Sequence, residues 1–98
     1  MSAALDRASR VRLVRHARLK MDPRTGKQVL LYPERGLELN DTAARVAALC
    51  GEERTVAELL ERMVAAADGA TPRAQIEDEV LVFLRALADR GLLEVQAR

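Results

Sequence analysis

Apolar and polar residues alternate early in the chain, after ten residues with no regular apolar spacing. Over residues 11–21 apolar side chains occupy mostly every second position, and the alternation slips near Val14 and Arg15. Such alternation is typical of a strand with one buried face. We therefore expect a flexible N-terminal arm over residues 1–10 and a strand over residues 11–21, with a break or bulge at the slip.

Two turn signals divide the next residues into further strands. Pro23 and Gly26 have hairpin-turn spacing, because proline fixes the first turn dihedral and glycine accepts a positive φ. A return strand over residues 28–32 follows. Residues 33–36 repeat the proline-to-glycine spacing, and residues 37–39 then form a short third strand. The pattern predicts an N-terminal three-stranded antiparallel β-meander.

The apolar spacing then becomes helical. Asn40 is a suitable N-cap for an Ala-rich helix over residues 41–50, which Gly51 ends. Thr55 and Glu58 have the spacing of a capping box. Behind this box the apolar residues fall on one helical face: Val56, Leu59, Leu60, Met63, Val64 and Ala67.

A third, longer helix is predicted near the C-terminus. Thr71 is the expected N-cap and Pro72 the first helical residue, and Gly91 fits the left-handed position after the last turn, with Leu92 folding back onto the helix. The residues expected to face the core are Ile76, Val80, Phe83, Leu84 and Leu87.

Three strands followed by three helices predict an α+β, winged-helix-like domain with its sheet on the N-terminal side of the helices. The chain has 98 residues, so we expect a single core and one domain over residues 11–95.

The composition excludes several kinds of function. Aromatic residues make up only 2% of the chain, which argues against a stacking platform for single-stranded nucleic acid. One cysteine and one histidine allow neither an internal disulfide nor a zinc set. The common phosphate-binding, hydrolase and metalloprotease motifs are absent, and no apolar stretch is long enough to span a bilayer. We expect a cytoplasmic protein that is not an enzyme and holds no cofactor or metal.

The reactive residues themselves favour structural interpretations. His16 lies in the basic N-terminal strand with no carboxylate nearby in sequence, and Cys50 ends an apolar helix. The acidic run at residues 77–79 is explained by favourable charge near the start of a helix. No catalytic residue is predicted.

Charge is unevenly distributed along the chain. Residues 1–28 hold eight Lys or Arg and two Asp or Glu, a charge of +6, whereas residues 29–98 hold eight and thirteen, a charge of −5. An Arg-rich segment on a winged-helix fold suggests nucleic-acid binding as an alternative function. However, the start of the third helix carries three acids against Arg73, and DNA would repel them. We therefore expect a solvated face or an acidic protein partner, and neither nucleic acid nor a membrane.

A second face of the third helix points away from the core. It carries two apolar residues and a charged pair, in the order Asp78, Leu81, Val82 and Arg85. Such apolar residues are also common as isolated surface positions. The other interpretation is the wall of a groove beside the third strand, whose free edge is able to pair with an extended peptide. Alternatively, the N-terminal arm or a second copy of the chain covers this edge, the latter in a homodimer.

Two stretches resemble a known family in their order and spacing. They are the segment Tyr32-Pro-Glu-Arg-Gly-Leu-Glu-Leu-Asn40, followed by Thr42-Ala-Ala and Thr55-Val-Ala-Glu-Leu59, and the segment from Asp78 to Leu93. Over roughly residues 10–95 the chain resembles the PqqD family of pyrroloquinoline quinone (PQQ) biosynthesis.

The resemblance implies a peptide chaperone, of the kind that recognises the precursors of ribosomally synthesised and post-translationally modified peptides (RiPPs). Family members bind the precursor peptide PqqA and present it to PqqE, a radical S-adenosylmethionine (SAM) enzyme that cross-links a Glu and a Tyr within it. The implied peptide site lies along the third strand and the third helix. With the strand edge and helix face above, the expected peptide-binding residues are Arg35, Leu37, Glu38, Leu39, Asp78, Leu81, Val82 and Arg85.

Overall fold

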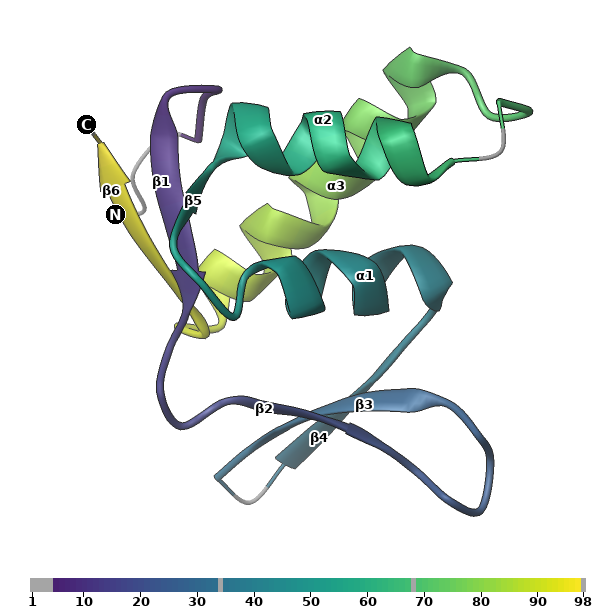
Figure 1. Ribbon diagram of the computed structural model, residues 1–98. Coiled ribbons are helices and arrows are strands. Elements are labelled where there is room, and N and C mark those ends of the chain that lie inside the picture. The colour runs from purple at the N-terminus through teal and green to yellow at the C-terminus, as the bar shows by residue number, and fades with distance from the viewer. Residues whose placement is uncertain (1–4, 34, 68, 98) are drawn as a thin grey trace.

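The computed structural model describes residues 5–33, 35–67 and 69–97. In that part of the chain, helix α1 lies between a three-stranded sheet and helices α2 and α3, and a second small sheet lies at one end of the helices (Figure 1). The strands are β1 Ser9–Leu13, β2 Arg18–Met21, β3 Gln28–Tyr32, β4 Arg35–Leu39, β5 Arg54–Thr55 and β6 Leu93–Ala97, and the helices are α1 Asp41–Leu49, α2 Val56–Ala66 and α3 Arg73–Asp89. The α+β class and the three helices agree with the sequence prediction.

The sheet β2-β3-β4 is the predicted meander. Its strands are antiparallel neighbours in sequence order, and Gly26 takes the expected positive φ in the first turn. Leu30 is fully buried at the centre of the sheet, opposite Leu19 and Leu37. Helix α1 packs on this inner face, so alternate residues of each strand enter the core.

The predicted strand over residues 11–21 is in fact two strands in different sheets. β1 ends at Leu13, whose N–H donates to the Cys50 carbonyl at an N···O distance of 2.8 Å, and the Val14 N–H donates to the Leu92 carbonyl at 3.0 Å. Both acceptors lie far along the chain. The slip near Val14 was correctly identified as a break, but it marks a change of sheet rather than a bulge.

Sheet β5-β1-β6 joins three remote segments, and the sequence did not indicate β5 or β6. β1 is the central strand, paired antiparallel with β5 on one edge and β6 on the other. It begins at Ser9, so Ser9 and Arg10 belong to the sheet rather than to the expected arm. Asp6 holds the preceding turn by accepting from the Ala8 and Ser9 N–H groups. Residues 1–4 of the arm lie outside the described residues.

The helix starts follow the predicted N-caps in two cases out of three. Asn40 accepts from the N–H of Ala43, and the Thr55 capping box is complete. Thr71 does not cap α3, because Pro72 precedes the first helical residue in an extended conformation, and no side chain caps this end. At the other end Gly91 has φ +73° and the Leu92 N–H bonds to the Leu87 carbonyl, as predicted.

Candidate functional site

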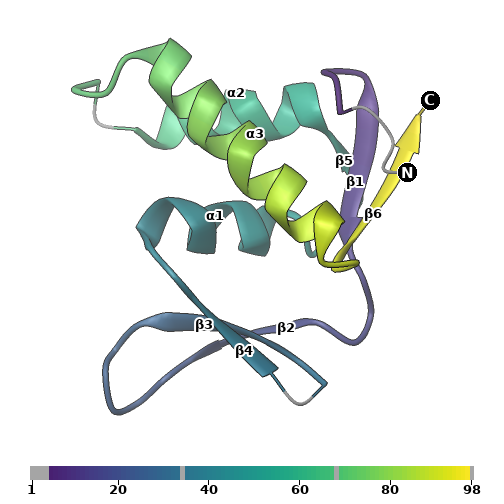
Figure 2. The same ribbon diagram turned by 180° about the vertical axis from the view of Figure 1, so that it is seen from behind.

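The outer edge of β4 is open among the described residues. β4 pairs with β3 along all five of its residues and with no other described strand. Its second edge therefore offers main-chain N–H and C=O groups that an extended peptide can pair with. β4 and α3 lie on the same side of the molecule (Figure 2).

The turn before β4 is shorter than predicted, because Gly36 pairs with Leu31 inside the strand. A Cβ atom on Gly36 would lie 3.1 Å from the Val29 Cγ1 atom and 3.3 Å from the Leu31 Cδ2 atom. This glycine therefore accommodates close packing in the sheet rather than a turn conformation. Glu34, within the turn, lies outside the described residues.

A groove of about 510 Å³ runs between α3 and the start of α1, next to the point where β4 ends. Val82, Phe83 and Ala86 form its apolar part on α3, facing Ala43 on α1. The remaining residues that line it are polar: Asn40, Thr42, Asp78 and Glu79. The groove and the open strand edge together offer a peptide both main-chain partners and a side-chain surface.

Two of the four residues predicted on α3 line this groove and two do not. Asp78 and Val82 are among its lining residues, and Val82 is 56% exposed. Leu81 is half-buried against the core, and Arg85 is exposed without lining the groove. Because neighbouring helical residues point about 100° apart, Leu81 and Val82 face different flanks of α3.

The four residues predicted on β4 differ in their exposure. Leu39 is only 5% exposed and belongs to the core, and Leu37 packs against the core half-buried. Arg35 and Glu38 are exposed, and Glu38 lies 3.5 Å from the Lys27 ammonium. What Leu37 and Leu39 offer a peptide is thus chiefly their backbone.

Sequence reasoning missed most of the groove's apolar surface. Phe83 was expected in the core, yet it is half-buried and lines the groove. Phe83 lies at the edge of the apolar face of α3. A residue in that position can contact both the core and the surface beside it, so the position was a signal for this role. Ala43 and Ala86 gave no signal, because the contribution of alanine depends entirely on what packs beside it.

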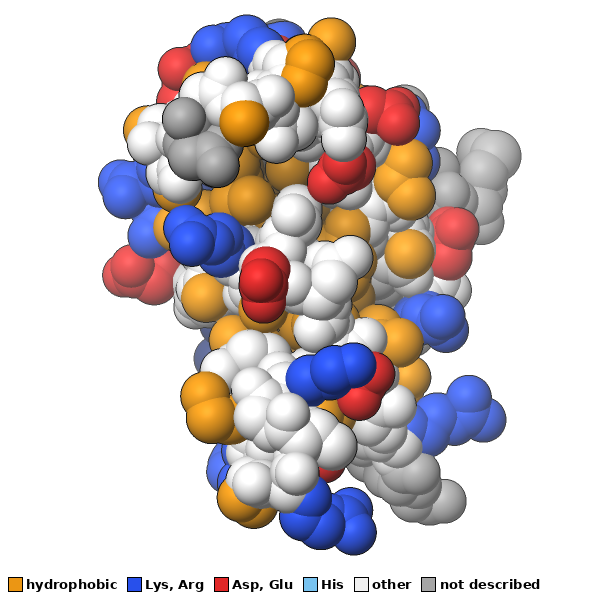
Figure 3. All heavy atoms as spheres, turned by 90° about the vertical axis from the view of Figure 1, so that its right-hand side faces the viewer, with side chains coloured by type: hydrophobic (Ala, Val, Ile, Leu, Met, Phe, Trp, Pro, Cys, Tyr) orange, Lys and Arg blue, Asp and Glu red, His pale blue; other side chains and the backbone are white. Residues whose placement is uncertain are grey.

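A second cleft adjoins the groove and shares Thr42 and Glu79 with it. Its volume is about 480 Å³, and it lies between the start of α1, the end of α2 and the first turns of α3. This side of the molecule has recesses lined by hydrophobic side chains, with charged side chains near their rims (Figure 3).

The acidic run on α3 is divided between two surfaces. Asp78 and Glu79 line the groove, whereas Glu77 binds Arg7 at 2.8 Å and Arg73 at 3.1 Å. Arg73 also contacts Glu61 on α2. The bond from Arg7, followed by that from Arg73, lowers the pKa of Glu77. A specific ion-pair network therefore holds Glu77, in place of the general helix-end effect that we expected.

The reactive residues lie apart from the groove. Cys50 is buried, and burial raises the pKa of its thiol to about 12. His16 is exposed. Within residues 5–33, 35–67 and 69–97, no three His, Cys, Asp or Glu side chains gather as a metal site would require. Nor does the described chain contain a helix long and apolar enough to cross a membrane.

Comparisons with known proteins show the family of this chain. Residues 27–93 match the family model for coenzyme PQQ synthesis protein D (PqqD). A "PqqA binding protein" of Bradyrhizobium diazoefficiens is 40% identical, covering 92% of this chain and 85% of the relative. In Methylorubrum extorquens, the "Bifunctional coenzyme PQQ synthesis protein C/D" is 39% identical over 85% of this chain and 22% of the relative.

A solved structure has the same fold. The solution structure of the PqqD truncation of Methylobacterium extorquens PqqCD, described as a stand-alone RiPP recognition element, aligns with a TM-score of 0.76 and 34% identity, covering 93% of this chain and 95% of that one. The chain therefore belongs to the coenzyme PQQ synthesis protein D (PqqD) family.

Proposed function

We propose that this chain binds a PqqA precursor peptide as an added strand on β4, with side chains of the peptide in the groove on α3. The observation that carries the proposal is the open β4 edge beside an apolar surface that includes Val82, Phe83 and Ala86. Strand addition supplies affinity through main-chain bonds, and the groove supplies selectivity. The relatives named as PqqA binding proteins support the choice of peptide.

We further propose that the bound peptide is presented to the radical SAM enzyme PqqE, and that the chain is a non-catalytic adaptor. Holding a peptide beside an enzyme raises its effective concentration and fixes its orientation, so the chemistry belongs to the partner. Mass spectrometry checks this division of roles. Cross-linked PqqA should form only when PqqE is present, and modification of the peptide by this chain alone would contradict it.

Binding of a synthetic PqqA peptide, measured by calorimetry, tests the site. Val82→Ser removes an exposed apolar contact, and we expect Kd to rise about tenfold, since burying such a side chain contributes about 1.5 kcal/mol. Leu31→Ser is the matched control, because Leu31 is 38% exposed and does not line the groove. An unchanged Kd for Val82→Ser, or equal losses for both variants, would exclude the groove.

A parallel titration with random duplex DNA at low salt tests the nucleic-acid alternative. Arg7 and Arg10, from the basic segment, are held by Glu77 and Glu53 at 2.8 and 3.0 Å. We therefore expect no salt-dependent binding at micromolar protein. Binding of DNA in place of PqqA would replace the proposed function.

A further inference from the structure

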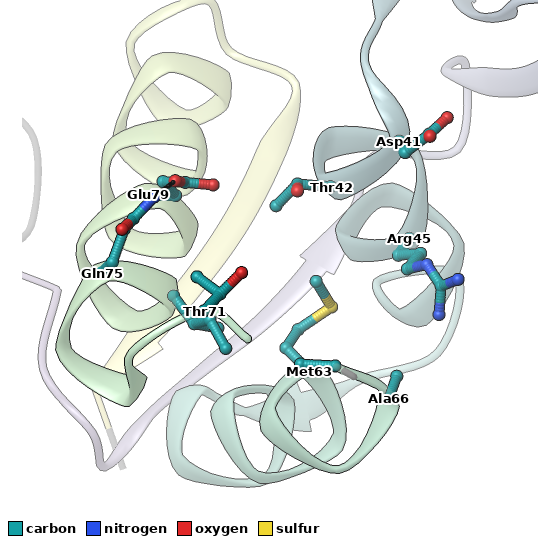
Figure 4. Close-up of a pocket in the computed structure, with 10 residues that line it drawn as sticks. Asp41, Thr42, Arg45, Met63, Ala66, Thr71, Gln75 and Glu79 are labelled. Carbon is teal, nitrogen blue, oxygen red and sulfur yellow. Dashed lines mark hydrogen bonds between the residues drawn. The ribbon is translucent and has the colours of Figure 1, made fainter. Parts of the chain in front are cut away.

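We propose that the cleft between the ends of the three helices binds a long cationic side chain, lysine or arginine, of the peptide. This inference rests on the proposed function. Ten residues line the cleft, from the start of α1, the last turns of α2 and the beginning of α3. Thr42, Met63, Thr71 and Glu79 point into the space between the helices (Figure 4).

The interior of the cleft combines an apolar surface with acceptor groups. Met63 and Ile76 lie at its base and are almost fully buried. Thr42 and Thr71 contribute hydroxyl oxygens, and Glu79 contributes a carboxylate. Lysine and arginine have the matching structure, a flexible apolar stem that packs on hydrophobic surface and a charged end that needs acceptors.

Glu79 retains the capacity to bind a cation. One of its carboxylate oxygens accepts from the Gln75 side-chain amide at 3.0 Å. Among the residues described, no Lys, Arg or His forms an ion pair with it, whereas its neighbour Glu77 binds two arginines. An incoming ammonium or guanidinium group would donate a charge-assisted hydrogen bond to the Glu79 carboxylate.

The other charges around the cleft are of both signs. Asp41 and Arg45 point away from the space between the helices (Figure 4). Of the three helix ends at the cleft, the end of α2 contributes the negative end of a helix dipole with no basic residue in its last turn, whereas the starts of α1 and α3 contribute positive ends. Arg45 lines the cleft but not the groove. The charged residues that line the groove are Asp78 and Glu79, so a cationic side chain that enters from the groove meets these two carboxylates first.

Because the groove and the cleft adjoin, one bound peptide can occupy both. Thr42 and Glu79 line the two cavities in common, so they stand where groove and cleft meet. A residue that lies over this junction would place its backbone in the groove and its side chain in the cleft. The cleft thereby selects a Lys or Arg close to the apolar residue that contacts Val82.

Calorimetry with substituted peptides tests this selection. Each Lys and Arg of a synthetic PqqA peptide is replaced in turn by norleucine, which keeps an apolar stem and removes the charge. One replacement should weaken binding about tenfold, the loss expected for one charge-assisted hydrogen bond. Glu79→Gln should cause a similar loss with the natural peptide. Combined with that one replacement, Glu79→Gln should cause no further loss, because the two changes remove the same contact.

Glu94→Gln is the matched control, because Glu94 is an exposed acid on β6 that lines neither cavity. Its Kd should equal that of the unmodified protein. The inference is overturned if the natural peptide binds at β4 but no norleucine replacement and no change at Glu79 alters Kd. If the natural peptide fails to bind at all, the proposed function fails instead, so the two failures are distinguishable.

Discussion

The two sheets of this domain differ in how they are assembled and in what they expose. Sheet β2-β3-β4 is built from consecutive strands, and β4 leaves one edge unpaired among the described strands, on the same side of the molecule as α3. Sheet β5-β1-β6 joins strands from the beginning, the middle and the end of the chain, with β1 paired on both edges. The proposed binding surface lies on the first sheet, whereas the second sheet connects remote parts of the chain.

The two oppositely charged parts of the chain meet in the structure. Residues 1–28 carry a charge of +6, and residues 29–98 carry a charge of −5. In the structure, Arg7 and Arg10 from the basic segment bind Glu77 on α3 and Glu53 before β5. These two pairs join the turn before β1 to α3, and β1 to the loop before β5. The carboxylates of Asp78 and Glu79 remain available at the groove.

The largest expected effect on stability comes from the packing of sheet β2-β3-β4 into the hydrophobic core. Leu30 is fully buried, so Leu30→Ala should lower the free energy of unfolding by about 2–5 kcal/mol. Its neighbour Leu31 faces the opposite side of the sheet and is 38% exposed, and Leu31→Ala should change stability by about 0.5 kcal/mol or less. Urea denaturation followed by circular dichroism measures both variants.

Leu13→Ala makes the matching change in the second sheet, since Leu13 is a buried residue of β1. A large loss in both variants, each with a single cooperative transition, would show that the two sheets share one core. A small effect of Leu30→Ala, or a separate transition for the open sheet, would contradict the shared core.

A smaller effect is expected from the ion pair that links Arg7, just before β1, to α3. The bonds from Arg7 and Arg73 lower the pKa of Glu77 below its ordinary value of 4.5. A carboxylate with a lowered pKa in the folded protein stabilises it above the ordinary value, and this contribution disappears as pH falls through the lowered pKa. The urea midpoint of Glu77→Gln should therefore lie below that of the unmodified protein near pH 7.

The same difference should disappear at acid pH. As the pH falls through the lowered pKa of Glu77, that carboxylate becomes protonated in the unmodified protein, whose midpoint then approaches that of Glu77→Gln. The urea midpoints of both proteins, measured from pH 3 to pH 7 in steps of about one unit, check this expectation. A midpoint difference that is constant with pH would show that the substitution acts through packing rather than through the ion pair.

The smallest effect is expected at Cys50, whose carbonyl accepts from Leu13 at the end of β1. Burial raises the pKa of its thiol to about 12, so the reactive thiolate is scarce at neutral pH. A thiol reagent should label the folded protein far more slowly than the urea-unfolded protein, and PqqA should leave that slow rate unchanged. Rapid labelling of the folded protein would show that the junction of β1 and α1 opens readily.

Local signals in the sequence were sufficient for the meander and for two helix starts. Asn40 and Thr55 cap their helices through side chains that accept from residues three positions later, so this spacing alone carries the information. Thr71 failed as a cap because Pro72 holds an extended backbone before the helix. β5 has only two residues and β6 pairs with a strand some eighty residues away. Pairings of that kind depend on tertiary packing.

The candidate site was predictable only in part for the same reason. The free edge of β4 and the exposure of Val82 follow from strand order and helical spacing, both of which are local. The facing wall of the groove comes from the start of α1. Its alanine could not be identified from the sequence, because an alanine side chain alone does not indicate whether it lines a groove. Phe83 was assigned to the core because periodicity identifies the apolar face of a helix but not how far a neighbouring helix covers it.

Amide hydrogen exchange with and without PqqA is the most direct test of whether the peptide adds to β4. Every second N–H of β4 should exchange more slowly, by about a hundredfold at a free peptide concentration near 100 Kd. The rates in β6, whose outer edge pairs with no other described strand, should stay the same. Slowing confined to β6 or to the helices α1 and α2, with β4 unaffected, would contradict the account.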